Sequence, residues 1–435
     1  MNIISTVGLG FGDEGKGVLL NYIANKYKDT PNSLYIKSSG GCQGRHTVRL
    51  ENGRYFSFSQ LSPSIIYDKI TYIKEGFIFE PFALLNEVDA LSKEIKQSKE
   101  KILANVYIDS QTICVTPYHK LYNQIEEETI HLRGSVGTGV SIAARDSLDD
   151  ITLRVRDIGN KDRLYDILNN QLQYYINKCK LNRFNYDRIV SYNISEYIQD
   201  LISIYTTHIK GCVVENFDYS GYNQIYECSQ GVLLDKDYGI KPNTTYLSTT
   251  NNETNKLLDI RKIGVIRSIY TRHGPGAFPT EDDKLNNIFS DTNQEIGKYS
   301  GKIRFGYFDM VLYRYALNVA QVSEVFMTCT DYLNRLDTIN ICTSYLYTGR
   351  IDDDFEEAFR YEIHGGSIYI RDIKNSTDRL KEFLDKSKPV YIGLGLKGKT
   401  FYERINNYFY YIEKNSGTPI KTISFGTNSK DILER

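Results

Sequence analysis

Thr6-Val-Gly-Leu-Gly-Phe-Gly-Asp-Glu-Gly-Lys-Gly17 is the stretch of sequence that decides the fold. A β-rich run at residues 2–8 leads into it, and residues 16–27 place apolar side chains at helical spacing. A strand, a glycine-rich loop and a helix in this order open a parallel α/β sheet. Glycines let backbone N–H groups turn toward a phosphate, and the start of the helix adds positive potential. We therefore predict a phosphate-binding loop, with nucleotide contacts at Gly12, Glu14, Gly15, Lys16 and Gly17.

Two acids lie inside this predicted loop. The segment from Gly10 to Lys16 has the spacing GxxxxGK, but no serine or threonine follows the lysine to hold magnesium. An acid among phosphate-binding amides repels the phosphate, so Asp13 needs another role. It could ligate magnesium or abstract a proton. The alternative is a glycine-rich turn that binds no ligand.

The remaining sequence alternates strand-like and helix-like segments. This alternation predicts an α/β fold with a large, mainly parallel central sheet and helical cover, which we expect to form a single domain over residues 1–435. Ligands of such sheets bind at the carboxyl ends of the strands. The expected strands are 34–37, 102–108, 224–228, 325–328, 390–393 and 422–425, and the expected helices are 117–128, 162–179, 190–208, 307–320 and 400–414.

Composition narrows the functional class. The 435 residues are 41% hydrophobic and 25% charged, as in ordinary globular proteins. A formal net charge of −1 gives no global field that favours nucleic acid or an anionic membrane. No apolar stretch reaches membrane-spanning length, and the N-terminus lacks a secretion signal. The seven cysteines have no metal-finger spacing. We expect a cytoplasmic protein with reduced thiols.

Several further segments match one known family in order along the chain. They follow the first loop, which is of the GDEGKGK type, and span most of the sequence. The segments are Ser38–Val48, Gly134–Val140, Glu227–Asp235, Tyr270–Glu281, Gly301–Asp309, Met327–Asp331 and Ser424–Gly426. They resemble GGNNAGHTV, GTTGRGIGP, EGAQGTLLD, YxTRVGxGPFPTE, the aspartate loop with GWLD, TKLD and STGP. The sequence therefore resembles the adenylosuccinate synthetase family.

This resemblance implies a ligase that uses a nucleoside triphosphate and Mg²⁺ to join L-aspartate to C6 of IMP. In the family a carboxylate removes the N1 proton and O6 attacks the γ-phosphate, with a histidine assisting the transfer. The aspartate amine then displaces the phosphate. Phosphoryl transfer of this kind depends on positioning and charge neutralisation. The resemblance also implies a homodimer and an adenylosuccinate-synthetase-like fold.

The resemblance implies a role for individual residues. Asp13 would be the general base and, with Arg45, would hold the metal. His46 would be the general acid, Lys16 would hold phosphate and Gln230 would contact the acceptor base. The predicted aspartate-binding residues are Lys302, Ile303 and Arg304. Further predicted nucleotide contacts are Gly44, Arg45, Thr47, Ser135, Val136, Thr245, Asp331, Ser424 and Gly426.

Three of these regions contain residues with a structural alternative. His46 could be a loop histidine hydrogen-bonded by backbone groups, and Asp331 could cap a helix. Arg272, in the Tyr270–Glu281 segment, could pair with a buried acid. Each alternative would explain the residue type without a ligand.

Departures from the family pattern gather at positions that read substrate. Ser135-Val136 replaces a pair of threonines, and the acids Asp149-Asp150 stand in the region of an arginine cluster. Arg45 replaces a glycine. Cys329 replaces the lysine that packs on guanine, which makes ATP an alternative to GTP as donor.

Three functions remain open on this evidence. The first is an adenylosuccinate synthetase with an IMP-like acceptor. The second is a specialised ligase acting on GMP or dGMP, like a phage branch of the family that typically replaces the loop carboxylate. The third is a non-catalytic nucleotide-binding or regulatory homologue. Retention of Asp13, Lys16, His46 and Gln230 together argues against the third.

Overall fold

The computed structural model describes residues 3–130, 134–148, 150–257, 259–289, 298–299, 301–336, 338–395 and 400–435. Asp149, at which the sequence departs from the family pattern, lies outside these residues. The chain forms two compact units. Unit 1 comprises Met1–Ile3 and Leu20–Ser229, and unit 2 comprises Ile4–Leu19 and Gln230–Arg435. The glycine loop at the start of the sequence therefore belongs to unit 2. A single domain over residues 1–435 stays a prediction.

Unit 1 contains a run of parallel strands in the order β10-β8-β6-β2-β11. Their bounds are Val213–Val214, Val106–Asp109, Ile70–Ile73, Ser33–Lys37 and Asn223–Glu227. Smaller strands flank this sheet: β3 (Gly40–Gly41), β7 (Phe77–Phe79) and β9 (Ile113–Cys114) pair together, as do β4 (His46–Arg49) and β5 (Tyr55–Phe58). The short strands β3 and β4 belong to the second glycine-rich segment.

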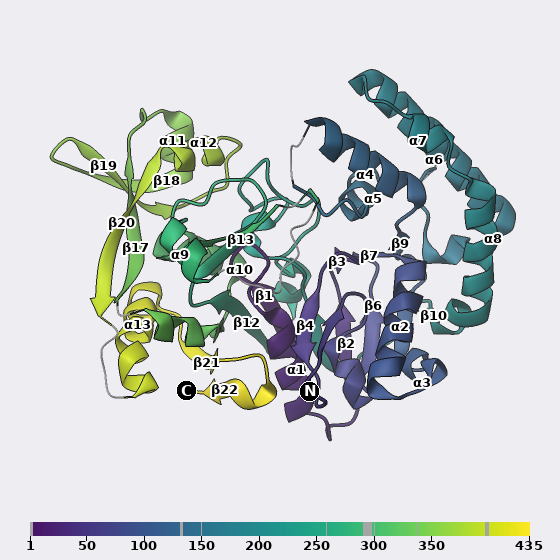
Figure 1. The fold of residues 1–435 in the computed structure, drawn as a ribbon, viewed down its shortest axis with the longest axis horizontal. Coiled ribbons are helices and arrows are strands. Elements are labelled where there is room, and N and C mark those ends of the chain that lie inside the picture. The colour runs from purple at the N-terminus through teal and green to yellow at the C-terminus, as the bar shows by residue number, and fades with distance from the viewer. Residues whose placement is uncertain are drawn as a thin grey trace. The chain divides into compact units, whose positions relative to one another are not determined.

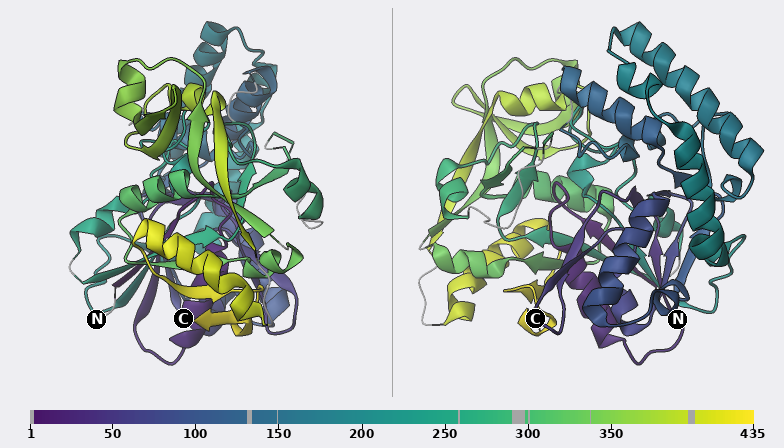
Figure 2. Two further views of the ribbon diagram at one scale, coloured as in Figure 1. Left: turned by 90° about the vertical axis from the view of Figure 1, so that its left-hand side faces the viewer. Right: turned by 45° about the vertical axis from the view of Figure 1, so that its right-hand side comes forward.

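The helices of unit 1 bury one side against a core that this unit supplies by itself. Helix α2 begins after Glu80, whose side chain accepts a hydrogen bond from the backbone of Ala83, and ends at Lys96 in a left-handed conformation. The helices lie along the sheet and beside one another (Figures 1 and 2). They are α2 (Pro81–Ile95), α3 (Lys99–Leu103), α4 (Pro117–Ile130), α5 (Val140–Arg145), α6 (Lys161–Asn182), α7 (Asp187–Val190) and α8 (Ile194–Ile204).

Unit 2 contains strands in the order β1-β12-β16-β21-β22. The pairs β12–β16 and β16–β21 are parallel, and the pair β21–β22 is antiparallel. Their bounds are Ile3–Gly8, Ile260–Arg267, Glu324–Thr328, Ile420–Ser424 and Ile432–Glu434. Helix α1 (Lys16–Lys26) begins in unit 2 and continues into unit 1. The hairpin-like pair β13 (Tyr270–His273) and β14 (Ile303–Gly306) is antiparallel and stands apart from this sheet.

A second sheet of unit 2 follows in the sequence, built from β15 (Phe308–Asp309), β17 (Thr338–Tyr347), β18 (Phe359–His364), β19 (Ser367–Ile373) and β20 (Ser387–Gly395). Its long strands β17 and β20 are antiparallel. The remaining helices are α9 (Asp283–Ile288), α10 (Met310–Ala320), α11 (Asp353–Ala358), α12 (Leu380–Asp385) and α13 (Phe401–Ser416). Helices α10 and α13 pack on this sheet, and in Figure 2 α13 is the yellow helix below the long strands.

The predicted α/β class with a large, mainly parallel sheet is confirmed, and most predicted elements lie within a few residues of their expected bounds. One prediction was wrong in part. Residues 102–108 include the end of helix α3, because a strand begins only at Val106. The strand predicted at 390–393 is confirmed as part of β20, which pairs antiparallel with β17 in the second sheet. An isolated apolar run does not reveal its partner strand.

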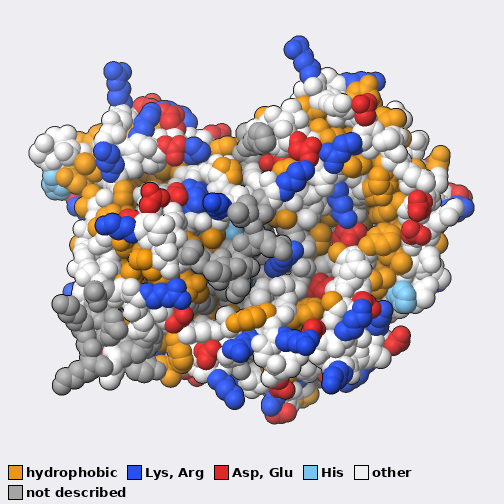
Figure 3. All heavy atoms as spheres, viewed as in Figure 1, with side chains coloured by type: hydrophobic (Ala, Val, Ile, Leu, Met, Phe, Trp, Pro, Cys, Tyr) orange, Lys and Arg blue, Asp and Glu red, His pale blue; other side chains and the backbone are white. Residues whose placement is uncertain are grey.

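Charged side chains of both signs interleave over the face of the molecule seen in Figure 3, in agreement with the formal net charge of −1. No helix within the described ranges is both long enough and apolar enough to cross a bilayer.

Candidate active site

The glycine loop of unit 2 runs from the end of β1 at Gly8 to the start of α1 at Lys16. The Glu14 carboxylate lies inside it and accepts hydrogen bonds from the N–H groups of Gly10 (3.1 Å) and Gly12 (2.6 Å). Its other oxygen lies 2.7 Å from the Nζ of Lys16, and both side chains are buried. The loop amides that we predicted to bind a phosphate thus donate to the side chain of Glu14. The same carboxylate pairs with Lys16, the lysine that we predicted to bind phosphate.

Asp13 occupies a different environment from its neighbour Glu14. Its side chain is 34% exposed, and its Oδ2 lies 3.0 Å from Nη2 of Arg267. The same oxygen lies 3.9 Å from Nε2 of His273. The loop therefore separates its two acids, since Glu14 satisfies the loop amides while Asp13 faces solvent and two basic side chains. A carboxylate in that position can accept a proton or ligate a cation.

Gln230 lies against the loop. Its backbone is in a left-handed conformation at φ 62°, and a side chain on Gly12 would come within 3.2 Å of its Cα. The buried Oε1 of Gln230 accepts no hydrogen bond from the described residues. The structure therefore brings two predicted residues, Asp13 and Gln230, to the same loop of unit 2. An open buried acceptor of this kind suits a ligand N–H group.

The predicted phosphate and base contacts of unit 2 lie in two further loops. The hydroxyl of Thr245 accepts a hydrogen bond from the N–H of Leu247 at 3.3 Å. Ser424 donates to the carbonyl of Gly426 at 2.7 Å, and its own carbonyl accepts from Thr330 at 2.8 Å. This last bond joins the Ser424–Gly426 loop to the turn that carries Asp331. Burial raises the pKa of Asp331.

Asp331 does not cap the short helical turn Thr330–Arg335, which begins after Cys329 without a side-chain cap. The structural alternative for this residue is therefore wrong. Cys329, at the position of the family lysine, has a left-handed backbone.

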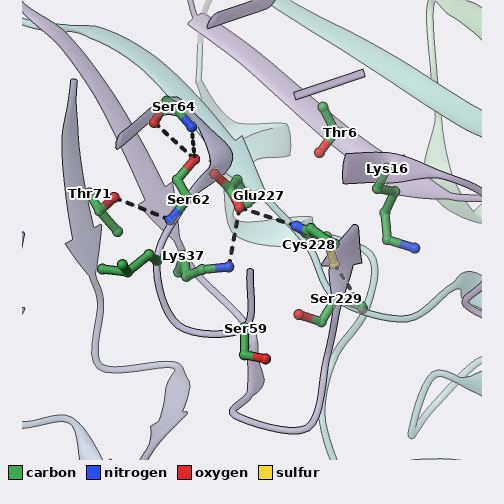
Figure 4. Close-up of polar contacts among 12 residues, drawn as sticks. Thr6, Lys16, Lys37, Ser59, Ser62, Ser64, Thr71, Glu227, Cys228 and Ser229 are labelled. Carbon is green, nitrogen blue, oxygen red and sulfur yellow. Dashed lines mark hydrogen bonds and ion pairs between the residues drawn. The ribbon is translucent and has the colours of Figure 1, made fainter. Parts of the chain in front are cut away.

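In unit 1, His46 pairs with a carboxylate. Its Nδ1 lies 3.5 Å from Oε2 of Glu227, and the same oxygen lies 3.3 Å from the Nζ of Lys37. All three side chains are buried, and Figure 4 shows Lys37 and Glu227 pointing toward each other. Burial raises the pKa of Glu227, but Lys37 and His46 outweigh it, so the pKa lies below its usual range. The alternative of a histidine held only by backbone groups is wrong, because an ionised carboxylate faces Nδ1.

The neighbours of His46 point elsewhere. Thr47 follows it in strand β4 with its side chain on the opposite, exposed side, where its hydroxyl lies 2.7 Å from that of Ser57. Arg45 is exposed, and Gly44 packs against Ser229. Arg45 could contribute only its backbone carbonyl to a metal, because a guanidinium has no acceptor.

The loop of Ser135 and Val136 is tied to helix α4. Glu127 accepts hydrogen bonds from the N–H groups of Gly134 and Ser135, each at 3.1 Å. Asn123 donates to the hydroxyl of Ser135 at 2.8 Å. Val136 is 56% exposed. Asp150 is exposed, and Nη1 of Arg154 donates to the carbonyl of Gln111 at 2.6 Å.

The predicted aspartate-binding residues lie on or beside strand β14. Lys302 is exposed, and Ile303 pairs with His273 across the β13–β14 ladder. Arg304 pairs with Arg272 in the same ladder and forms an ion pair with Glu281 at 2.6 Å. Arg272 is buried, but its Nη1 donates to the carbonyl of Ala277, so the alternative in which it pairs with a buried acid is wrong.

Among the described residues no group of three or more His, Cys, Asp or Glu side chains is arranged to hold a metal ion. Magnesium usually takes one or two carboxylates together with substrate phosphates, so Asp13 alone still fits this role. Its side chain is partly exposed and pairs with Arg267.

A family model described as adenylosuccinate synthetase matches residues 5–433. The chain belongs to the adenylosuccinate synthetase family. It is an adenylosuccinate-synthetase-like ligase, and its sequence is divergent. The adenylosuccinate synthetase of Caldicellulosiruptor bescii is 27% identical over 457 residues, covering 99% of each chain. That of Pelodictyon phaeoclathratiforme is 30% identical over 364 residues, covering 80% of this chain and 81% of the relative.

Two solved structures support the same fold. The fully ligated enzyme of Plasmodium falciparum matches over 100% of both chains with a TM-score of 0.80 and 20% identity. A cyanophage S-2L succinoaminodeoxyadenylate synthetase, bound to dGMP and to dATP as energy donor, matches with a TM-score of 0.58 and 14% identity, covering 100% of this chain and 95% of the other.

Sequence reasoning missed four residues of these clusters. Glu227 opens a quoted family segment, and His273 stands where the pattern YxTRVGxGPFPTE has valine, so both could have been noticed. Lys37 and Arg267 each end a strand and carry no motif signal. Their importance follows only from the ion pairs with Glu227 and Asp13.

Proposed function

We propose that this protein uses a nucleoside triphosphate to join L-aspartate to C6 of a purine nucleotide through a 6-phosphoryl intermediate. The observation that carries the proposal is that the two acids of the glycine loop have different surroundings. Glu14 accepts hydrogen bonds from two loop amides and pairs with Lys16, whereas Asp13 is one-third exposed and pairs with Arg267. This arrangement supplies a carboxylate for proton abstraction without disturbing the loop.

The reaction assigns each group a step. Asp13 takes the N1 proton, and the electron pair of that bond passes to O6. O6 attacks the γ-phosphorus, and the bond to the bridging oxygen breaks, which releases the diphosphate. The aspartate amine then adds at C6 and loses a proton. The C6–O6 bond breaks, and its electron pair leaves with the phosphate. Phosphorylation is needed because an unactivated ring oxygen is a poor leaving group.

His46 assists phosphoryl transfer in this proposal. Its Nδ1 faces Glu227, and this ion pair orients the imidazole ring. The open Oε1 of Gln230 accepts a hydrogen bond from the purine. Thr245 contacts the acceptor phosphate, and Asp331 and the Ser424–Gly426 loop contact the donor base.

Magnesium would be held by Asp13 and by phosphate oxygens of the donor. When bound, it would neutralise charge on the transferring phosphoryl group. We further infer that the protein forms a homodimer, which light scattering of the purified chain would measure directly.

The acceptor that we favour is a hypoxanthine nucleotide such as IMP, because Asp13 is retained. A guanine nucleotide, GMP or dGMP, is the alternative, since residues around the acceptor such as Ser135 and Val136 depart from the family pattern. Either GTP or ATP serves as donor, because Cys329 removes the lysine that packs on guanine.

One experiment tests the function and identifies its substrates. The purified protein is incubated with Mg²⁺, L-aspartate and either GTP or ATP, against IMP, dIMP, GMP, dGMP and free nucleosides. Phosphate release and product mass are followed. Release that requires both aspartate and one acceptor supports the ligase and names that acceptor. No release in any combination would favour the non-catalytic homologue and reject the proposal.

A further inference from the structure

A cavity of about 450 Å³ lies in unit 1 at the outer part of its parallel sheet. Three neighbouring strands end at it, since Lys74 follows β6, Asp109 ends β8 and Glu215 follows β10. Open α/β sheets bind their ligands at the carboxyl ends of the strands. The described residues that line the cavity include none of the site residues predicted from the sequence. The cavity is therefore a second place on this sheet where a ligand can bind.

One wall of the cavity is aromatic and consists of Tyr72, Phe217 and Tyr219. The centre of the Phe217 ring lies 5.1 Å from that of Tyr72 and 6.4 Å from that of Tyr219. Tyr107 stacks on Phe217 at a centre-to-centre distance of 5.0 Å. The buried Tyr72 donates from its hydroxyl to Asp109 at 2.7 Å, which holds its ring in place. Such a wall attracts apolar groups and also cations, because the face of an aromatic ring carries negative potential.

Charged side chains of both signs also line the cavity. Glu75, Glu215 and Arg156 are exposed, and none of them forms a side-chain hydrogen bond or an ion pair with another described residue. The other two charged lining residues already have partners, because Asp109 accepts from a tyrosine hydroxyl and Lys74 interacts elsewhere within the protein. A ligand therefore meets two carboxylates and one guanidinium that are available for pairing.

We propose that this cavity binds a free amino acid with a cationic side chain, of which L-arginine is the type. The α-carboxylate of the amino acid pairs with Arg156. Its α-ammonium group and its side-chain cation pair with Glu75 and Glu215, and its side chain lies over the ring of Phe217. Each available charge of the cavity then has a partner of opposite sign. This site is additional to the one that carries the proposed function and does not depend on the ligase reaction.

Other classes of small molecule leave charges of the cavity unpaired. A nucleotide can stack its base on the aromatic wall, but its phosphate then faces two carboxylates and a single available guanidinium. A simple amine leaves Arg156 without a partner, and a dicarboxylate such as L-aspartate brings a second negative charge to the two glutamates. The volume of the cavity lies within the range of about 300–1,000 Å³ that is typical of small-molecule sites.

Calorimetric titration of the purified protein with L-arginine tests the proposal directly. The titration is carried out with and without an excess of L-aspartate. We expect one L-arginine to bind per chain with the same affinity in both, because L-aspartate has no second cation for the two glutamates. Absence of L-arginine binding, or displacement of L-arginine by L-aspartate, would overturn the proposal.

Variants of the exposed lining residues show whether L-arginine binds in this cavity. Arg156→Gln and Glu215→Gln should each weaken L-arginine binding about two- to fivefold, as expected of ion pairs near solvent, and the double variant about tenfold. Both residues are exposed, so the variants are expected to fold. Arg54→Gln is the control, since Arg54 is an exposed arginine of the same unit that pairs with Glu94 and does not line the cavity. Wild-type affinity in the double variant would place L-arginine elsewhere and contradict the proposal.

Two analogues of L-arginine test the chemical class of the ligand. Agmatine lacks the α-carboxylate, and L-norleucine replaces the cationic side chain with an apolar one. Both should bind the wild type several-fold more weakly than L-arginine, and Arg156→Gln should not weaken agmatine binding further. Agmatine binding as tightly as L-arginine would mean that the cavity accepts amines without recognising a carboxylate. Equal affinity for L-norleucine would remove the role of the side-chain cation, and either result would reject the proposal.

Discussion

Two glycine-rich loops can be compared, Gly8–Gly17 in unit 2 and Gly134–Gly139 in unit 1. In both loops backbone N–H groups are bonded to a glutamate, but the loops expose different side chains. In each, a buried glutamate accepts hydrogen bonds from two backbone N–H groups of the loop. Glu14 does so in the first and Glu127 in the second. A glycine-rich pattern therefore does not by itself mean an open anion site, because a side chain of the protein can occupy the amides.

The two loops differ in the side chain that they expose to a ligand. The first loop keeps Asp13 one-third exposed beside Arg267. The second loop exposes Val136, and the hydroxyl of Ser135 is already bonded to Asn123. We infer that the first loop carries chemistry and that the second mainly supports helix α4.

Among the changes that test this comparison, Asp13→Ala should have the largest effect, which is a loss of turnover. Loss of a general base lowers the rate by about 10²–10⁴-fold. Binding of the nucleoside triphosphate should persist, because the amides, Glu14 and Lys16 are untouched. Phosphate release and calorimetric titration with the triphosphate measure the two properties. Asp150→Ala, at an exposed acid, is the control. Unchanged turnover in Asp13→Ala would remove this carboxylate from the mechanism.

Glu14→Gln tests the buried carboxylate of the first loop. It leaves the ammonium of Lys16 buried without its partner and should lower the free energy of unfolding by about 3–5 kcal/mol. Urea denaturation measures the change, with the exposed Glu51→Gln as control, for which we expect less than about 0.5 kcal/mol. Equal losses in both variants would mean that the Glu14–Lys16 pair does not stabilise the loop.

Glu127→Gln is the matching change in the second loop and should cost less. A glutamine keeps one acceptor oxygen, so one of the two N–H groups of Gly134 and Ser135 loses its partner, at a cost of about 1–3 kcal/mol. The same urea denaturation applies. A loss larger than that of Glu14→Gln would reverse our ranking of the two loops.

Val136→Thr should have the smallest effect. The side chain is 56% exposed, so the free energy of unfolding should change by less than about 0.5 kcal/mol. If the tip of this loop meets the acceptor phosphate, the added hydroxyl should lower KM for the acceptor nucleotide by up to about tenfold. Val190→Thr, at a valine of equal exposure, is the control. No change in KM would place the phosphate away from Val136.

Local sequence predicted the strand and the helix on either side of the first glycine loop to within two residues. The strand predicted at 2–8 is β1 at Ile3–Gly8, and the helix predicted at 16–27 is α1 at Lys16–Lys26. Both depend on apolar periodicity and on glycines, which act over a few residues. Asp13 and Gln230 were predicted from separate motifs, and the structure brings them to one loop. Sequence reasoning also recognised that an acid inside phosphate-binding amides needs a special explanation.

The sequence alone thus determined the fold class, the family and the residue types that carry the chemistry. Only the tertiary structure decided which acid of the loop fills the amides, since Glu14 and Asp13 are adjacent and chemically alike. It also decided that Lys37 faces Glu227, 190 positions away, and that Arg272 faces Arg304 across a ladder. Such pairings depend on where the chain returns in space. A charged side chain in a sequence does not specify its partner, because that partner is set by strand order and register.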